Sequence, residues 1–200
     1  MKRNSSLGTE SRQNGFSLVE LMIALVIALV VAGIAVPNLA TAIANVRLRG
    51  SASDLSGLLQ RARLAAVQNN ATYTVRFLSG QPAGAYADLN NNGSFDSGEP
   101  MIQFGGTTTQ VAAPNGTGGA PSALDGVGGS LGWTATTGNV SFNPRGLPCD
   151  VTRAPCGTNV GYVFYLRDTR AGGQGGWAAV SVTAAGRIKV WMWSGTAWID

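Results

Sequence analysis

The stretch Gly15-Phe16-Ser17-Leu18-Val19-Glu20 is followed by a run of apolar and small residues, Leu21 to Val36, that carries no charge. Phe16 to Val36 thus forms a 21-residue span with a single carboxylate near its start. With a rise of about 1.5 Å per residue, a helix of this length crosses the roughly 30 Å hydrocarbon core of a bilayer. The sequence therefore predicts one transmembrane helix over residues 16–36.

Glu20 is the unusual member of this span. An unpaired carboxylate in lipid costs about 2.5–3.5 kcal/mol, so we expect a partner charge for it. A secretory signal peptide has a short apolar core followed by a cleavage site of small residues. The run here is too long for such a core, and Glu20 at its head does not fit one. A simple membrane anchor explains the length of the run but neither Gly15 nor Glu20.

The segment GFSLVE, together with the apolar helix that follows it, resembles the type III signal of type IV pilins and pseudopilins. Pro37 also stands at the usual kink position of those helices. The resemblance implies that a prepilin peptidase cuts between Gly15 and Phe16 on the cytoplasmic side, and that Phe16 is then N-methylated. It further implies that Glu20 pairs with the free N-terminal amine of a neighbouring subunit during assembly, which supplies the expected partner.

Composition limits the chemistry of the rest of the chain. The 200 residues are 44% hydrophobic and only 12% charged, with 28 Gly, which is typical of a β-rich, loop-rich exported domain. There is no His, which excludes Ser-His triads, His-based acid–base catalysis and His-ligated metals. No nucleophile motif, phosphate-loop pattern or pair of catalytic carboxylates stands out, so no enzyme is expected. The net charge of +4 does not by itself imply a nucleic-acid partner.

The flanks of the span predict its orientation. Residues 1–15 are polar and form a cleaved leader, whose Lys2, Arg3 and Arg12 favour a cytoplasmic amino terminus. The head is then expected in the periplasm, on the far side of the inner membrane. Cys149 and Cys156 lie seven residues apart in a Pro-rich loop, and in that oxidising compartment a disulfide between them is favoured over two free thiols.

The predicted fold is α+β, with one long N-terminal helix packed on an antiparallel β-sheet head. Pro37 should kink the helix rather than end it, and residues 37–69 extend the transmembrane part. An apolar seam with helical spacing continues along this extension through Leu48, Ala52, Leu55, Leu59, Ala62 and Ala66. Within the head, residues 70–200, strands are predicted at 71–78, 84–89, 101–104, 139–143, 161–167, 177–183 and 187–193. Residues 105–132 are low in complexity and are expected to form a long mobile loop.

Residues 88–99 match the pattern of a twelve-residue calcium loop, D-x-N-x-N-G-x5-E. The oxygen ligands would be Asp88, Asn90, Asn92, Asp96 and Glu99, and Gly93 would allow the sharp turn. Predicted strands rather than helices flank the loop, and Asn-Gly is also typical of hairpin tips. A structural Ca²⁺ and a metal-free hairpin tip therefore both stay open, and no other cofactor is expected.

Three segments of the head resemble the GspH/FimT family of minor pseudopilins and minor pilins. They are the run from Asp88 to Pro100, the Ser141-Phe-Asn-Pro-Arg-Gly146 turn, and the Val180-Ser-Val-Thr-Ala-Ala-Gly-Arg187 run. The resemblance implies a minor subunit that primes, caps or joins a type II secretion pseudopilus or a type IV pilus. Its partners would be other pilin subunits, the prepilin peptidase and the inner membrane.

The alternative function is DNA binding, because FimT-like minor pilins include DNA receptors with a basic Gly-Arg-x-Arg stretch near the C-terminus. The matching positions here are 186–189, where Lys189 replaces the second Arg and loses its planar fork. Strand geometry places Arg187, Lys189, Trp191 and Trp193 on one face, with Ile188, Val190 and Met192 on the other. A basic-aromatic face can hold phosphates and stack on bases. The other interpretation is that these Trp side chains pack within the head or against a neighbouring subunit.

Overall fold

The computed structural model describes residues 15–80, 82–116, 120–124, 133–135, 138–150, 161–169 and 176–200. Most of the predicted leader and Cys156 lie outside these residues. The chain forms two compact units that divide between Leu39 and Ala40, and each is described by itself.

Helix α1 spans Leu18–Gln68 and contains Pro37 in its interior, as predicted. Within the first unit its apolar side chains are exposed, so the unit itself provides no cover for them. Among the described residues, α1 is the one helix with the length and composition to cross a membrane. The helix ends at the predicted pair of asparagines, where Asn70 adopts a left-handed φ of 49° and the Ala71 N–H donates to the Ala66 carbonyl at 3.1 Å.

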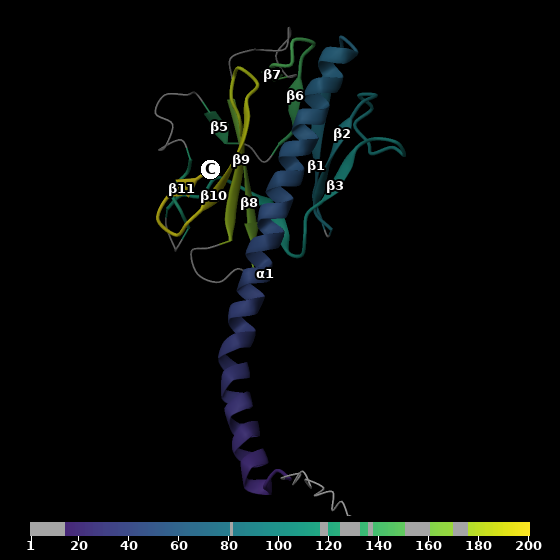
Figure 1. The fold of residues 1–200 in the computed structure, drawn as a ribbon. Helices are drawn as coiled ribbons and strands as arrows, with labels where there is room; N and C mark the ends of the chain where they lie inside the picture. The colour runs from purple at the N-terminus through teal and green to yellow at the C-terminus, as the bar shows by residue number, and fades with distance from the viewer. Residues whose placement is uncertain are drawn as a thin grey trace, which may run out of the picture. The chain divides into compact units, whose positions relative to one another are not determined.

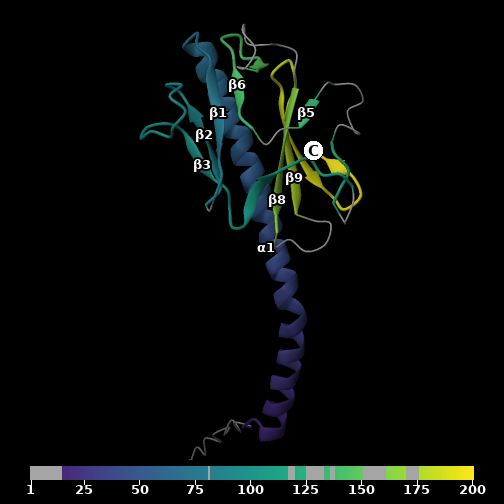
Figure 2. The same ribbon diagram turned by 180° about the vertical axis from the view of Figure 1, so that it is seen from behind.

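The second unit contains two sheets, one on each side of α1 (Figure 1, and from behind in Figure 2). The first sheet is antiparallel with the order β3-β2-β1-β6-β7: Met101–Gln103, Gly84–Asp88, Tyr73–Leu78, Val140–Phe142 and Pro148–Cys149. The second sheet has the antiparallel order β11-β10-β9-β8-β4: Trp198–Ile199, Ile188–Trp193, Trp177–Val182, Gly161–Asp168 and Thr108–Val111. Strand β5, Trp133–Ala135, pairs in parallel with β8. The predicted helix on an antiparallel head is confirmed, with two sheets in place of one.

The second half of α1 is the centre of the head's core. Every residue of the predicted seam is fully buried: Leu48, Ala52, Leu55, Leu59, Ala62 and Ala66. The seam packs on Val75 and Ala85 from the first sheet and on Phe164 and Val180 from the second. Burying one Leu side chain contributes about 1.5–3 kcal/mol. Because both sheets contribute to one cluster, neither sheet has a complete core without the helix.

Arg63 connects α1 to a turn from each sheet. Its Nε donates to the Gly146 carbonyl at 2.9 Å and its Nη1 donates to the Gly186 carbonyl at 2.8 Å. Both glycines have a positive φ, 72° and 80° respectively. A Cβ on Gly186 would lie 2.6 Å from the Gly146 carbonyl oxygen, so the close approach of the two turns requires glycine there. These turns belong to two of the three segments that resemble the GspH/FimT family.

The prediction of a long loop over residues 105–132 is wrong for Thr108–Val111, which form a strand. Strand β4 lies within it and pairs with β8. The hydroxyl of Thr107 donates to Asp168 at 2.6 Å, and the N–H of the buried Leu124 donates to the Tyr165 hydroxyl at 2.7 Å. The composition did not indicate this order because contacts with β8, rather than local propensity, hold the segment.

We expect Arg63→Ala to lower the free energy of unfolding by about 2–3 kcal/mol, because two part-buried carbonyls lose a charged donor. The measurement is denaturant unfolding of the detergent-solubilised full chain, followed by tryptophan fluorescence. Arg61→Ala, at an exposed position of the same helix, should change stability by less than about 0.5 kcal/mol. Equal losses in the two variants would contradict the role given to Arg63.

Candidate functional site

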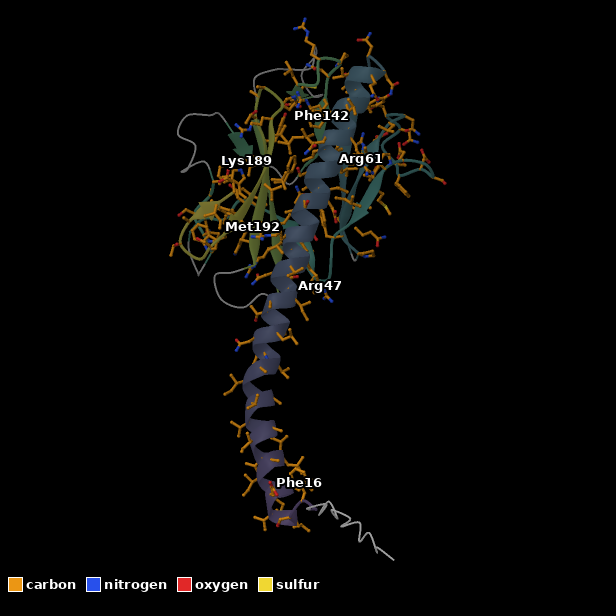
Figure 3. The ribbon with its side chains drawn as sticks, in the orientation of Figure 1. Phe16, Arg47, Arg61, Phe142, Lys189 and Met192 are labelled. Atoms are coloured by element: carbon orange, nitrogen blue, oxygen red, sulfur yellow. The ribbon has the colours of Figure 1, made fainter. Side chains whose placement is uncertain are left out.

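The N-terminal site consists of Gly15, Phe16 and Glu20. Gly15 and Phe16 precede the first helical residue, and Phe16 is 81% exposed, so the peptide bond between them lies outside the helix (Figure 3). An irregular, exposed segment is accessible to a peptidase. Glu20 lies in the first turn of α1, where the helix dipole favours a carboxylate. Within the described ranges no basic side chain forms an ion pair with Glu20.

Strand β10 has the two faces that the sequence predicted. Ile188, Val190 and Met192 pack against the main core that contains α1. Trp191 and Trp193 pack instead on a second cluster, formed by Leu124, Val163, Tyr165, Trp177, Ala179 and Trp198. The aromatic face of β10 therefore packs on the head, with both Trp side chains half-buried.

The residues predicted to bind DNA are mostly engaged within the head. Lys189 forms an ion pair with Asp200, which lowers the pKa of that carboxyl, and its ammonium lies 4.2 Å from the centre of the Trp191 ring. The Trp191 indole N–H donates to the Ser181 hydroxyl at 2.9 Å. Arg187 is exposed. This charge pairing removes much of the basic character expected for the face.

Trp193 is likewise held by aromatic packing. Its ring meets that of Trp198 nearly edge-on, with centroids 5.4 Å apart. These contacts cover part of each ring and leave the side chains half-exposed. The geometry thus supports the packing interpretation of the C-terminal strand, and DNA binding stays a prediction.

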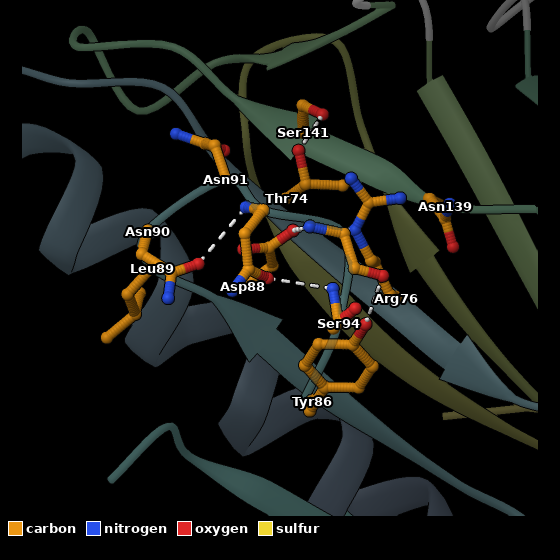
Figure 4. A network of polar contacts seen from close by, with 12 residues as sticks. Thr74, Arg76, Tyr86, Asp88, Leu89, Asn90, Asn91, Ser94, Asn139 and Ser141 are labelled. Atoms are coloured by element: carbon orange, nitrogen blue, oxygen red, sulfur yellow. Dashed lines mark hydrogen bonds and ion pairs between the residues drawn. The ribbon is translucent and has the colours of Figure 1, made fainter. Parts of the chain in front are cut away.

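The loop that follows β2 is closed by its own hydrogen bonds (Figure 4). Asp88 is fully buried, and its Oδ2 accepts from Arg76 Nε at 2.7 Å and from the Gly93 N–H at 2.9 Å. Burial alone would raise the pKa of Asp88, but these two hydrogen bonds and the charge of Arg76 outweigh it and hold the pKa below its ordinary value. Asp88 is therefore a buried anion with a guanidinium beside it.

Glu99 closes the other end of the loop. Its Oε1 accepts from the Leu89 N–H at 2.8 Å, and its Oε2 accepts from the Asp96 N–H at 3.1 Å. The carboxylate of Asp96 accepts in turn from the side-chain amides of Asn90 and Asn92. All five predicted calcium ligands are thus used to bond one another or the loop backbone.

This arrangement does not fit an occupied calcium site. The Oδ1 atom of Asp88 is buried without a hydrogen-bond partner in the described part of the chain, but it is a single ligand, whereas Ca²⁺ takes six to eight oxygens. Among the described residues no group of three His, Cys, Asp or Glu side chains could hold a metal ion. Arg76 already supplies a positive charge to Asp88. The geometry favours the metal-free tip, and calcium binding stays a prediction.

The predicted disulfide involves one residue that the structure describes. Cys149 is buried in β7 with 1% of its surface exposed. Cys156 lies outside the described residues, so the bond between them stays a prediction.

Residues 11–36 match the family described as the prokaryotic N-terminal methylation motif, which confirms the predicted N-terminal signal. No curated protein matches the chain. Two crystal structures of the type IV minor pilin FimU from Pseudomonas aeruginosa are similar to it. One shows 18% identity and a TM-score of 0.46, covering 76% of this chain and 92% of FimU. The other shows 17% identity and a TM-score of 0.47, covering 76% of this chain and 97% of the FimU chain. The chain thus carries the N-terminal methylation motif, and its long helix packs on antiparallel sheets.

The lowered pKa of Asp88 gives stability a defined dependence on pH. The unfolded chain, with an ordinary Asp pKa of about 3.9, takes up this proton before the folded chain does. The stabilisation is therefore complete above that value and is lost as the pH falls through the lower folded pKa. We expect Asp88→Asn to cost about 1–3 kcal/mol at pH 7 and to flatten the loss of stability on acidification, measured by denaturant unfolding.

The matched control is Asp54→Asn, which removes an exposed carboxylate from α1. It should keep both the stability at pH 7 and the wild-type decline in acid. An acid decline that is the same in Asp88→Asn as in the wild type would contradict the account of this carboxylate.

Proposed function

We propose that the chain is a non-enzymatic, membrane-anchored pilin-like subunit that is cleaved between Gly15 and Phe16, N-methylated and assembled with other pilin subunits. The single observation that carries this proposal is the methylation motif over residues 11–36, which leads directly into the apolar half of α1. The anchor would cross the inner membrane once, with the amino terminus in the cytoplasm and the head in the periplasm. The prepilin peptidase is the enzyme that would act on it.

Glu20 would direct assembly through charge pairing. It lies among exposed apolar side chains at the start of α1, where an unpaired carboxylate in lipid costs about 2.5–3.5 kcal/mol. Cleavage before Phe16 creates a free amine four residues from Glu20 in the sequence. The same amine on a neighbouring subunit can offset this cost, which makes side-by-side packing of the helices favourable.

For the head we propose the role of a minor subunit of the GspH/FimT kind, in a type II secretion pseudopilus or a type IV pilus. Two of the segments that resemble that family meet at Arg63, which supports a common structural role for them. The internal engagement of Lys189, Trp191 and Trp193 favours assembly over DNA uptake. The DNA alternative would depend on Arg187, the exposed member of the predicted set.

We expect Glu20→Gln to be processed normally but to enter filaments at least tenfold less than the wild type. The reason is that the lost ion pair offsets more than the 1.4 kcal/mol that corresponds to a factor of ten. Leader removal is followed by the gel shift of the processed chain, and assembly by the amount recovered in sheared filaments.

Asp54→Asn is the matched control, since it makes the same change of charge on the same helix beyond the apolar span and should assemble normally. Wild-type assembly of Glu20→Gln would remove the charge-pairing role. A block in processing would assign Glu20 to recognition by the peptidase instead.

A further inference from the structure

Two adjoining hollows lie near the end of α1, where the helix meets the turns at Gly146 and Gly186. Their volumes are about 410 and 360 Å³, and Gln60 and Arg63 line both of them. Figure 3 marks this stretch of the helix with Arg61. Together the two hollows form one surface, the basic hollow, and its other lining residues include Leu64, Val67, Arg187 and Ile188. All of these residues belong to the second unit.

The charge of the basic hollow comes from three arginines. Arg63 and Arg187 line it, and Arg145 stands in the turn whose Gly146 carbonyl accepts from Arg63. None of the three forms an ion pair with a carboxylate among the described residues. The carboxylate of Asp200 is paired with Lys189 rather than with Arg187. The hollow therefore offers positive charge that the described part of the chain does not neutralise.

The basic hollow also exposes apolar side chains. Leu64 is 56% exposed and Val67 is 48% exposed, although they belong to a helix whose other side is buried in the core. Among the described residues no aromatic side chain lines the hollow, so a nucleic-acid base would find no ring there to stack on. Apolar side chains beside arginines complement a protein surface that is acidic and carries an apolar side chain.

Residues 89–100, the acidic loop, join β2 to β3 and have this complementary character (Figure 4). The carboxylates of Asp96 and Glu99 accept hydrogen bonds from amide groups, which leave their negative charge in place. Neither carboxylate forms an ion pair within the described ranges. Phe95 is 43% exposed, and its ring meets that of Tyr86 edge-on with centroids 5.6 Å apart. The loop thus presents two anions and an aromatic ring in an arrangement that its own contacts hold before any partner binds.

We infer that the acidic loop of one copy of the chain docks in the basic hollow of a second copy. The loop carboxylates face Arg63 and Arg187, and the ring of Phe95 packs on Leu64 and Val67. Because the two surfaces lie on different elements of the head, the contact is heterologous and can repeat from copy to copy, as an open filament requires. An acidic segment of a different subunit shares this chemistry, but the matching loop is present on this chain. The inference rests on the assembly proposed above and identifies a contact between heads.

The test is disulfide cross-linking between two copies of the full chain in membranes. One copy carries Ser94→Cys in the acidic loop and the other carries Gln68→Cys beside the basic hollow, and both positions are exposed. We expect an oxidant to join the two variants into a dimer that neither variant forms alone. Ser53→Cys, at an exposed position earlier on α1, replaces Gln68→Cys as the control and should give no dimer. Equal yields with the two partners would indicate random collision and overturn the inference.

Charge exchange tests whether the two surfaces face each other. Arg187→Glu in the hollow, or Ser97→Lys in the loop, should lower the yield about fivefold, because each replaces an attraction with a repulsion. The two changes together should restore the yield, since the new charges attract each other. Arg49→Glu makes the same substitution at an exposed position away from the hollow and should keep the original yield.

A yield that the single changes leave unaltered, or that the double change fails to restore, would overturn the inference. So would filaments that form without the cross-link, and in that case the proposed assembly would stand. Loss of both filaments and cross-link would contradict the proposed assembly as well. Duplex DNA that binds the original chain but not Arg187→Glu, without any cross-link, would assign the hollow to nucleic acid and overturn the inference.

Discussion

The guanidinium group of Arg63 is the point at which the helix and both sheets meet. Its planar fork donates from two different nitrogens to carbonyls of two turns, which a single ammonium group could not reach with the same geometry. The buried seam from Leu48 to Ala66 supplies most of the stabilisation, but apolar packing alone is tolerant of small shifts. Arg63 fixes the position of the helix, because both of its hydrogen bonds form only at one position of α1 along the sheets. The glycines at the two turns allow the backbone to come close enough for this.

The two halves of α1 differ in whether their apolar side chains are covered. From Ala44 onward its buried face is the core of the head, whereas its apolar side chains before Leu39 have no cover within their own unit. Apolar surface of that extent is stable only against lipid or against other helices. Glu20 is the one charge in this part of α1, and a carboxylate in such surroundings needs a cation. The uncovered apolar side chains and the unpaired Glu20 thus favour membrane insertion followed by assembly, as the sequence motif does.

Much of this architecture could be predicted from the sequence because the signals are local. The spacing of the seam, the Asn69-Asn70 pair and the alternation along β10 all follow from neighbouring residues. The role of Arg63 could not be predicted, since its acceptors lie 83 and 123 residues away in the chain. The formation of strand β4 and the pairing of Lys189 with Asp200 also depend on tertiary contacts. The calcium-loop pattern shows most clearly what a local sequence pattern misses. All positions of the pattern are present in the sequence, but Arg76 lies twelve residues before Asp88, outside the pattern. Its guanidinium group lies beside Asp88, the first predicted ligand.

We propose that, in the working protein, α1 begins at a processed and methylated Phe16. The most direct measurement is mass spectrometry of the N-terminal peptide of protein recovered from membranes and from assembled filaments. We expect a peptide that starts at Phe16 and carries one N-methyl group in both fractions. Recovery of assembled protein that still carries residues 1–15 would contradict it.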